Sequence, residues 1–181
     1  VSGVVAVGPP PASKAVPAPP PGLGVTAPVV ILNLTPIGAQ YRVTHSDGSQ
    51  NEVSVAVNPR DARNIVVAAN DWRNGVDAWC GVYATKDGGV TWVEQLIPRA
   101  GNMSFLQAAG DPSVAFDPDG NVYQGCLGFN RTGAQGNIIA VTKSRDGGVT
   151  WGTPVQVVGA VPRVFHDKPY MGVDRSSGPT R

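Results

Sequence analysis

The sequence of 181 residues has little of what dominates metal, redox and nucleic-acid chemistry. It holds 2 cysteines, 2 methionines and 2 histidines, and its formal net charge is only +1. So small a charge excludes a strongly basic surface for nucleic acid or for an acidic membrane. No apolar run approaches the roughly 20 residues that span a bilayer. The sequence therefore predicts neither a nucleic-acid partner nor insertion into a membrane.

Glycine and proline, by contrast, are abundant, with 23 and 17 residues. Two segments have nearly the same sequence, 85–92 (TKDGGVTW) and 144–151 (SRDGGVTW), and lie 59 residues apart. A fixed period of this size indicates a repeated supersecondary unit. Asp-Gly-Gly favours a turn, while the residues before it and the Val-Thr-Trp after it favour strands, so each segment predicts a β-hairpin. We expect the aspartate to accept hydrogen bonds from loop amides and the tryptophan to pack beneath.

The period extends beyond these hairpins. Asn58-Pro59 and Asp117-Pro118 are again 59 residues apart, and a third, partial copy lies at 167–174. Each full copy reads as strand, tight turn, strand, loop, strand, turn and strand. The strand-prone runs before the hairpins are 52–59, 65–70, 111–118 and 122–127, with turns at 60–64 and 119–121. Four antiparallel strands in about 59 residues make one blade of a β-propeller.

The expected fold class is therefore all-β, a β-propeller segment of four-stranded antiparallel blades. The chain divides into a Pro-rich N-terminal extension or linker at 1–28, strands completing or bridging the propeller at 29–49, blades at 50–98 and 110–158, and the start of a further blade at 167–181. Propellers typically close with about four to eight blades. We therefore expect a fragment, a split chain, or one subunit of a propeller that several chains close.

The N-terminal part leaves two alternatives open. Residues 9–28 are a polyproline-type stretch, which is either a spacer or a ligand for a proline-binding domain. Residues 29–34 (VVILNL) are an apolar strand, and Tyr41–Thr44 are a candidate for another. The apolar strand either belongs to the propeller, completing a blade or packing on it, or pairs with the edge of a neighbouring molecule.

Cys80 and Cys126 lie on the third strand of one blade and the second strand of the next. They lack the spacing of a metal site, and His45 and His166 are too scattered to complete one. They are either an inter-blade disulfide of a secreted protein or two buried free thiols.

No cofactor is expected, with Ca²⁺ in the turns as the alternative. The aspartates that suggest it are Asp47, Asp111, Asp117, Asp119 and Asp167. Asp117-Pro-Asp-Gly, however, resembles a tight turn more than a loop of alternating oxygen ligands.

The two hairpins resemble the Asp box (BNR repeat) of sialidases and other Asp-box propellers, whose pattern is Ser/Thr-x-Asp-x-Gly-x-Thr-Trp. The matching residues are Thr85, Asp87, Gly89, Thr91 and Trp92 in the first copy and Ser144, Asp146, Gly148, Thr150 and Trp151 in the second. The resemblance covers residues 50–174. It implies that each box joins the third and fourth strands of a blade on the outer rim, away from any active site. The two aspartates are then structural and not catalytic.

The resemblance also implies a secreted, extracellular or periplasmic protein of the exo-α-sialidase type, acting on or binding glycans or glycoproteins. Such enzymes use three arginines on the substrate carboxylate, an aspartate acid/base and a tyrosine nucleophile with a glutamate. The Arg-Ile-Pro motif of the first arginine is missing, because Leu96–Arg99 has the letters in another order. We therefore assign no catalytic residue, and expect this chain alone to be inactive.

Three candidate ligand contacts remain, namely Asp71, Arg73 and Arg131. In the loop between the second and third strands, Asp71 would be an acid/base and Arg73 a clamp; alternatively, Asp71 caps a turn and Trp72 packs between blades. The competing functions are a non-catalytic extracellular scaffold or adhesion module that assembles through residues 29–44, and an assembly factor. Further copies of the chain, or a C-terminal portion, would close the propeller.

Overall fold

The computed structural model describes residues 42–132 and 136–176. Their first sheet contains β1 (Gln50–Asn58), β2 (Asp61–Asp71), β3 (Trp79–Thr85) and β4 (Val93–Leu96), and their second contains β5 (Ala108–Phe116), β6 (Val122–Phe129), β7 (Ile138–Ser144) and β8 (Val155–Val158). A short 3₁₀-helix, η1 (Gly101–Met103), lies between the sheets in sequence. The linker at 1–28 and the strand at 29–34 lie outside the described residues. Within the described ranges, no helix is long and apolar enough to cross a membrane.

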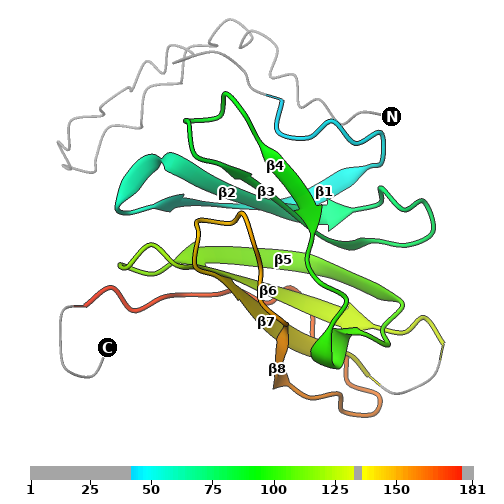
Figure 1. The fold of residues 1–181 in the computed structure, drawn as a ribbon. Coiled ribbons are helices and arrows are strands. Elements are labelled where there is room, and N and C mark those ends of the chain that lie inside the picture. Colours follow the sequence, from blue (N-terminus) through cyan, green and yellow to red (C-terminus); the bar gives the residue numbers. More distant parts are fainter. Residues whose placement is uncertain (1–41, 133–135, 177–181) are drawn as a thin grey trace, which may run out of the picture. The chain divides into compact units, whose positions relative to one another are not determined.

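Both sheets are antiparallel meanders, as Figure 1 shows. Their strand orders are β1-β2-β3-β4 and β5-β6-β7-β8, which is also the order in sequence. The β-branched and aromatic residues of each run favour strands, and a tight turn or a loop separates each run from the next. The all-β class with four-stranded antiparallel blades is therefore confirmed. The described residues form two consecutive blades of a β-propeller.

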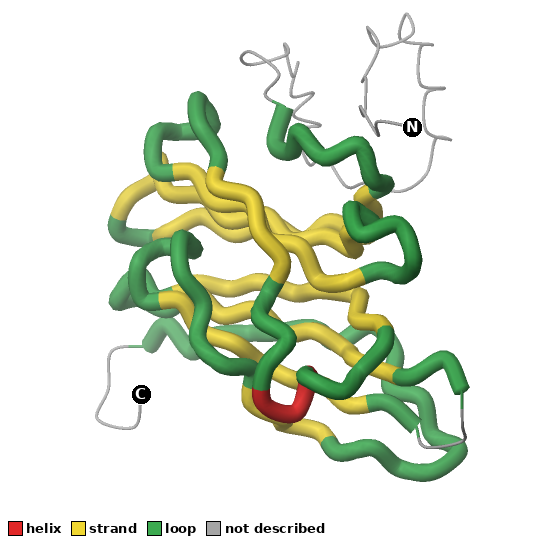
Figure 2. The backbone as a smooth tube through the Cα atoms, turned by 45° about the vertical axis from the view of Figure 1, so that its right-hand side comes forward, coloured by secondary structure: helices red, strands yellow, loops and turns green. Residues whose placement is uncertain are grey.

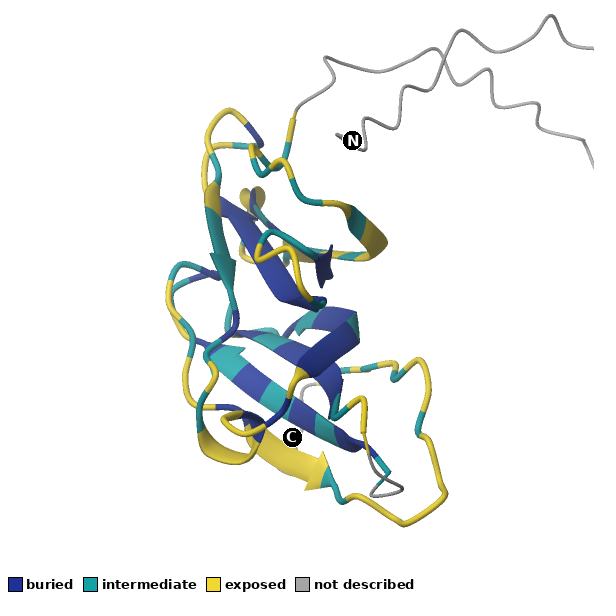
Figure 3. Ribbon diagram, turned by 90° about the vertical axis from the view of Figure 1, so that its right-hand side faces the viewer, coloured by how far each residue is buried: buried dark blue, intermediate teal, exposed yellow. Residues whose placement is uncertain are grey.

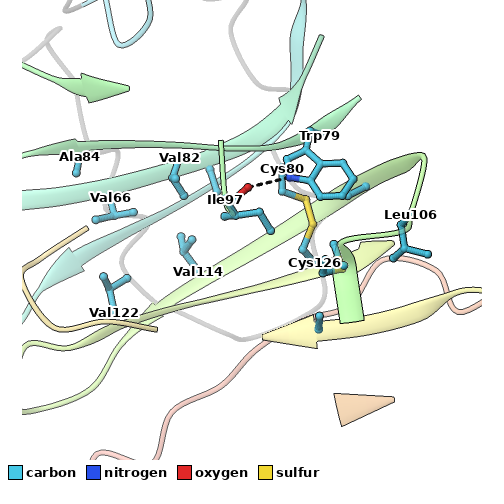
Figure 4. Close-up of a cluster of buried hydrophobic side chains, with 14 of the residues drawn as sticks. Val66, Trp79, Cys80, Val82, Ala84, Ile97, Leu106, Val114, Val122 and Cys126 are labelled. Atoms are coloured by element: carbon cyan, nitrogen blue, oxygen red, sulfur yellow. Dashed lines mark hydrogen bonds between the residues drawn. A yellow bond between two sulfur atoms is a disulfide. The ribbon is translucent and has the colours of Figure 1, made fainter. Parts of the chain in front are cut away.

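The core lies between the two sheets. Strand β5 packs against β1, β2 and β3 of the first sheet, and buried valines from both sheets meet there (Figure 4). Cys80 on β3 and Cys126 on β6 are both 0% exposed and form a disulfide across this core. The alternative of two free thiols is therefore wrong. Trp79 closes one end of the core, where its Nε1 donates a hydrogen bond to the carbonyl of Ile97 at 3.0 Å.

The turn expected at 60–64 is shorter than its sequence indicates. Only Pro59 and Arg60 form the turn, because β2 already begins at Asp61. The pairing shifts from Val57 opposite Ile65 to Asn58 opposite Asp61, so the residues between them form a bulge. The bulge buries Asn64. A run of polar residues is typical of turns and of such bulges alike, and the sequence does not distinguish them.

The strands expected directly after the two Asp-Gly-Gly turns begin later than predicted. Val90 and Thr91 belong to a bend, Trp92 has no regular structure, and β4 starts at Val93; in the second copy, β8 starts only at Val155. The cause is that the threonine amides bind the turn aspartates instead of a neighbouring strand. Residues 42–49 and 167–174 also form no strand (Figure 2).

Gln124 on β6 is a polar side chain in the interior between the sheets. It is 0% exposed, and neither of its amide atoms has a hydrogen-bond partner among the described residues. Gln124 on β6 lies opposite Val114 on β5. The corresponding pair in the first blade is Val67 on β2 opposite Val55 on β1, so the first blade has valine at the position of Gln124. An unpartnered buried amide destabilises a fold by about 1–3 kcal/mol.

We therefore expect Gln124→Met to raise the free energy of unfolding by about 1–2 kcal/mol in urea denaturation. The control is Gln95→Met, because Gln95 donates to the carbonyls of Gly148 and Val149 at 3.2 and 2.9 Å. That variant will lose stability. A loss of stability at both positions would contradict the interpretation of Gln124.

Candidate functional site

The two hairpin turns have the same internal hydrogen bonds. In the first hairpin turn (residues 85–92), the Asp87 carboxylate accepts from the Thr91 amide at 2.9 Å, the Thr91 hydroxyl at 2.5 Å and the Thr85 hydroxyl at 2.7 Å. Hydrogen bonds from Thr91 and Thr85 hold the pKa of Asp87 far below its usual value. Trp92 donates from Nε1 to the carbonyl of Gly89 at 3.0 Å and closes the turn.

The second hairpin turn (residues 144–151) repeats this arrangement. Asp146 accepts from the Thr150 amide at 2.9 Å, the Thr150 hydroxyl at 2.5 Å and the Ser144 hydroxyl at 2.7 Å, and Trp151 donates to the carbonyl of Gly148 at 3.1 Å. Burial opposes ionisation of Asp146, but the hydrogen bonds from Thr150 and Ser144 outweigh it and lower its pKa. Both carboxylates are therefore occupied in holding their turns.

The second hairpin turn is also a joint between the blades. Asn64 of β2 is 2% exposed, and its amide donates to the carbonyls of Gly147 and Thr85, each at 2.9 Å. One side chain thus binds both hairpin turns. Gln95 of β4 binds the second turn as well, at Gly148. At the equivalent place of the first hairpin turn, no residue that the structure describes lies within 4 Å of a Cβ on Gly88.

The candidate contacts Asp71 and Arg73 bind each other. Asp71 is 1% exposed and accepts from Arg73 Nη2 at 2.6 Å, from the Arg73 amide at 2.8 Å and from the Tyr83 hydroxyl at 2.5 Å. Burial opposes ionisation of Asp71, but the bonds from Arg73 and Tyr83 lower its pKa. Burial and the neighbouring Asp71 raise the pKa of Tyr83 well above its usual value. Asp71 thus caps the turn at the end of β2, buried against Arg73 and Tyr83.

The third candidate, Arg131, is also paired. Its Nη2 lies 2.6 Å from Asp77 Oδ1 and its Nε 2.9 Å from Asp77 Oδ2, with the guanidinium 4.9 Å from the centre of the Phe129 ring. This is a bidentate pair between the β2–β3 and β6–β7 loops, and the Arg131 side chain is 59% exposed. It joins the two blades at the surface. None of the three candidates contacts another of them except Asp71 with Arg73.

Three further residues lie close together at one end of the sheets, although no sequence motif groups them. Glu52, Asp111 and Lys168 have φ angles of 53°, 49° and 50°, in the left-handed region that non-glycine residues rarely adopt. Glu52 and Asp111 each lie in a bulge, where the pairing of β1 and of β5 skips two residues. Their spacings of 59 and 57 residues place all three at the same position of successive copies.

The three side chains form an ionic cluster. The Lys168 ammonium pairs with the Glu52 carboxylate and lies 3.9 Å from Asp111 Oδ1. The Asp111 amide donates to Asn70 Oδ1 at 2.7 Å, which fixes the bulge to the end of β2. The side chains of Glu52, Asp111 and Lys168 are 40%, 15% and 47% exposed, so solvent reaches the cluster.

We call Glu52, Asp111 and Lys168 the axial cluster. Its two carboxyl groups titrate differently. Burial, and the hydrogen bond and charge of Glu52, raise the pKa of Asp111 to about 6, although Lys168 opposes the rise. Hydrogen bonds from Asp111 and Lys168 lower the pKa of Glu52. One carboxyl therefore keeps a proton in mildly acidic solution while its neighbour is ionised. Two carboxyls with separated pKa values are the usual arrangement of an acid and a base.

This difference predicts how stability depends on pH. Between about pH 4 and pH 6 the folded chain binds a proton at Asp111 that the unfolded chain has released, so the free energy of unfolding falls as pH rises. Asparagine readily adopts the left-handed backbone conformation, and its side chain does not titrate, so Asp111→Asn removes the group that binds this proton. We expect the fall in urea midpoint between pH 4 and 6 to be smaller in the variant. Parallel midpoint curves for both proteins would contradict the assignment.

The calcium alternative finds no further support in the turns. Asp117 accepts from the amides of Asp119 and Asn121, each at 2.9 Å, and from the Asn121 side chain at 2.7 Å, so its own turn occupies the carboxylate. Among residues 42–132 and 136–176, no three His, Cys, Asp or Glu side chains are grouped to hold a metal ion.

No known protein family matches the sequence, and no curated protein matches it. Among solved structures, the fold is similar to the GH93 α-L-arabinofuranosidase of Fusarium graminearum in complex with arabinobiose, with a TM-score of 0.45 and 19% sequence identity. The match covers 62% of this chain and 33% of that enzyme, so the chain spans about a third of that length. This similarity carries no inference about substrate or site.

Proposed function

We propose that this protein is a secreted β-propeller protein that binds or cleaves glycans at the axial cluster. The observation that carries the proposal is the convergence of Glu52, Asp111 and Lys168, equivalent residues of three copies, each held in a strained backbone conformation. Such strain is typically retained where function needs it. In a propeller, the first strands of successive blades face the central channel, and β1 and β5 are the first strands here.

The chemistry of the cluster suits carbohydrates. Ionised carboxylates accept hydrogen bonds from sugar hydroxyls, and an ammonium group donates to them. Most glycosidases work with a protonated and an ionised carboxyl group on either side of the glycosidic bond. Asp111, with a pKa of about 6, and the ionised Glu52 resemble such a pair in charge. Their mutual hydrogen bond, however, holds them closer than the roughly 5–9.5 Å that separates the two carboxyls of a glycosidase, so the cluster favours binding over cleavage.

The sialidase specificity that the hairpins suggest is the narrower form of this proposal, and the charges disfavour it. A sialic acid carboxylate needs free guanidinium groups, yet Arg73 and Arg131 are each occupied by an aspartate. The cluster itself has two carboxyls and one ammonium, so it repels an anionic sugar once both carboxyls are ionised. Tyr83 is buried against Asp71 and has a raised pKa, which disfavours it as a nucleophile. We therefore favour a neutral glycan as the ligand.

Secretion, the remaining part of the proposal, is supported by the Cys80–Cys126 disulfide, since disulfides persist mainly in oxidising compartments. The hairpin turns also support it through their resemblance to the Asp boxes of secreted propeller proteins. The scaffold alternative through residues 29–44 concerns mostly residues outside those described.

The test is calorimetric titration of the purified protein with neutral oligosaccharides (lactose, cellotriose, xylotriose and arabinotriose) and with sialyllactose. We expect a neutral sugar to bind, and Asp111→Asn or Glu52→Gln to weaken it by about 10-fold or more, as for a lost hydrogen bond to a charged group. Asp61→Asn, an exposed carboxylate at the other end of the strands, is the control and will not change binding. Unchanged affinity in both cluster variants would refute the proposed site, and binding of sialyllactose alone would restore the sialidase form.

A further inference from the structure

We propose that a proton shared by Asp111 and Glu52 regulates the axial cluster, and that a glycan binds there only after this proton has left. This regulation rests on the proposed function, a glycan site at the cluster, and adds a direction to it. The affinity for a neutral glycan then rises with pH in mildly acidic solution. Two features of the cluster lead to this conclusion, namely the fixed positions of its carboxyl groups and the charges around them.

The backbone holds the two carboxyl groups next to each other. Glu52 lies in the bulge of β1 and Asp111 in the bulge of β5, each with a left-handed backbone. The Asp111 amide donates to Asn70 Oδ1 at 2.7 Å, and the Lys168 amide donates to Asp111 Oδ2 at 3.4 Å. The side chains of Glu52 and Asp111 are hydrogen-bonded to each other. Because an ionised carboxylate is only an acceptor, this bond exists only while one of the two carboxyls holds a proton.

The charges around Asp111 determine when this proton leaves. Glu52 from β1 and Asp167 favour the protonated form of Asp111, whereas Lys168 favours the ionised form. The Lys168 ammonium pairs with Glu52 and lies 3.9 Å from Asp111 Oδ1. From β2 comes the neutral Asn70. The uncharged residues of β6 opposite the bulge of β5 are Gly125, Cys126 and Leu127. One cation thus faces three acids, and burial together with Glu52 raises the pKa of Asp111 to about 6.

The proton leaves to solvent. Residues 161–170, which include Asp167 and Lys168, lie at the surface, and most of them are exposed (Figure 3). As the pH rises through about 6, the O–H bond of the Asp111 carboxyl breaks and the proton passes to water. Both carboxylates are then ionised and remain side by side, because the two bulges fix them, and a single ammonium group neutralises one of them.

A neutral glycan binds better to the ionised cluster for two reasons. A hydrogen bond to an ionised acceptor is roughly twice as strong as one to a neutral acceptor. A sugar hydroxyl that donates to both carboxylates also takes the place of the shared proton and offsets their mutual repulsion. In the protonated cluster, the hydrogen bond between Asp111 and Glu52 already occupies this place. Glycan and proton therefore compete for the cluster.

Competition with one proton fixes the expected pH profile. The fraction of molecules with Asp111 ionised is about 0.9 at pH 7 and about 0.09 at pH 5, and the apparent affinity scales with this fraction. The probe is whichever of lactose, cellotriose, xylotriose and arabinotriose binds at pH 7. We expect its dissociation constant, measured by calorimetry, to rise about tenfold from pH 7 to pH 5. Titrations at pH 6 in two buffers with different heats of ionisation will show about half a proton released per bound sugar.

Two variants identify the group that binds the proton. Asp167→Asn removes an acid that favours the protonated form of Asp111, so the dissociation constant at pH 7 will be unchanged and its rise at pH 5 will be less than about fivefold. In Asp111→Asn, the side-chain amide stays a donor to Glu52 at every pH. Its weakened binding will therefore be the same at pH 5 and pH 7. Asp61→Asn is the control and will keep the profile of the wild type.

The outcomes separate the regulation from the site itself. A dissociation constant that is equal at pH 5 and pH 7, or lower at pH 5, would overturn the regulation and leave the glycan site in place. A tenfold rise that persists in Asp111→Asn would assign the proton to another group and equally overturn it. If none of the four sugars binds at any pH, the proposed function fails, and the regulation fails with it. Tryptophan fluorescence, which we expect to be unchanged between pH 5 and pH 7, excludes unfolding as the cause of weaker binding.

Discussion

Replacing Gly147 with alanine will lower the free energy of unfolding by about 3–5 kcal/mol, whereas the same change at Gly88 will lower it by only about 1–2 kcal/mol. Both glycines have the same left-handed conformation, with φ of +75° and +76°, so the backbone penalty for a side chain is equal. The surroundings differ. A Cβ on Gly147 would overlap Oδ1 of the buried Asn64, whereas none of the residues described in the structure lies within 4 Å of a Cβ on Gly88.

The difference between the two variants therefore measures the joint between the blades. Displacing Asn64 also weakens its hydrogen bonds to Thr85 and Gly147, which leaves buried carbonyls without a donor. Urea denaturation of the wild type and of both variants, at one pH and with a common slope, gives the two energies. Equal losses at Gly147 and Gly88 would mean that the second hairpin turn does not seat on the first blade.

Removing the disulfide will have a second large effect. Cys80 and Cys126 are 46 residues apart and link β3 of the first blade to β6 of the second. In the chain-entropy account, a cross-link that closes a loop of this size stabilises a fold by about 4 kcal/mol, and the usual range is about 2–4 kcal/mol. We expect Cys80→Ala with Cys126→Ala to lower the free energy of unfolding within this range. Loss of the two buried sulfur atoms adds to the effect.

Reduction of the wild-type protein separates these two contributions. Unfolding with and without a thiol reductant gives the effect of the cross-link alone, and the double variant serves as the control, since the reductant has no disulfide in it to break. We expect the reductant to destabilise the wild type and to leave the double variant unchanged. A wild-type protein equally stable in both conditions would show that the disulfide does not hold the blades together.

The repeated segments explain why the fold could be predicted from the sequence. The match between 85–92 and 144–151 fixes a period, and a period with turn residues at regular places determines a four-stranded antiparallel unit. The ends of the strands could not be predicted in the same way. The bulge at Asn64 and the late starts of β4 and β8 depend on which partner each amide binds, and such partners are often distant in sequence.

The candidate site shows the same limit. Asp71, Arg73 and Arg131 were reasonable candidates by position, yet each is occupied in an ion pair, and pairing depends on three-dimensional distance. The axial cluster carried a signal in the sequence, because Glu52, Asp111 and Lys168 occupy one position of three copies. The sequence signal was weak because the residue at that position is acidic in two copies and basic in the third, so the copies do not match there. Only the backbone geometry and the ion pairs bring them together as a site.

The most direct test of the central claim, a ligand site at the axial cluster, is a titration of ¹⁵N-labelled protein followed by amide chemical shifts. The probe is whichever of the four neutral oligosaccharides gives heat on mixing. We predict that the largest shifts occur at Glu52, Asp111 and Lys168 and at their neighbours Asn70 and Ser113, and that Asp111→Asn removes them. Shifts confined to the two hairpin turns, or to the loop around Arg73, would place the ligand elsewhere and contradict the account.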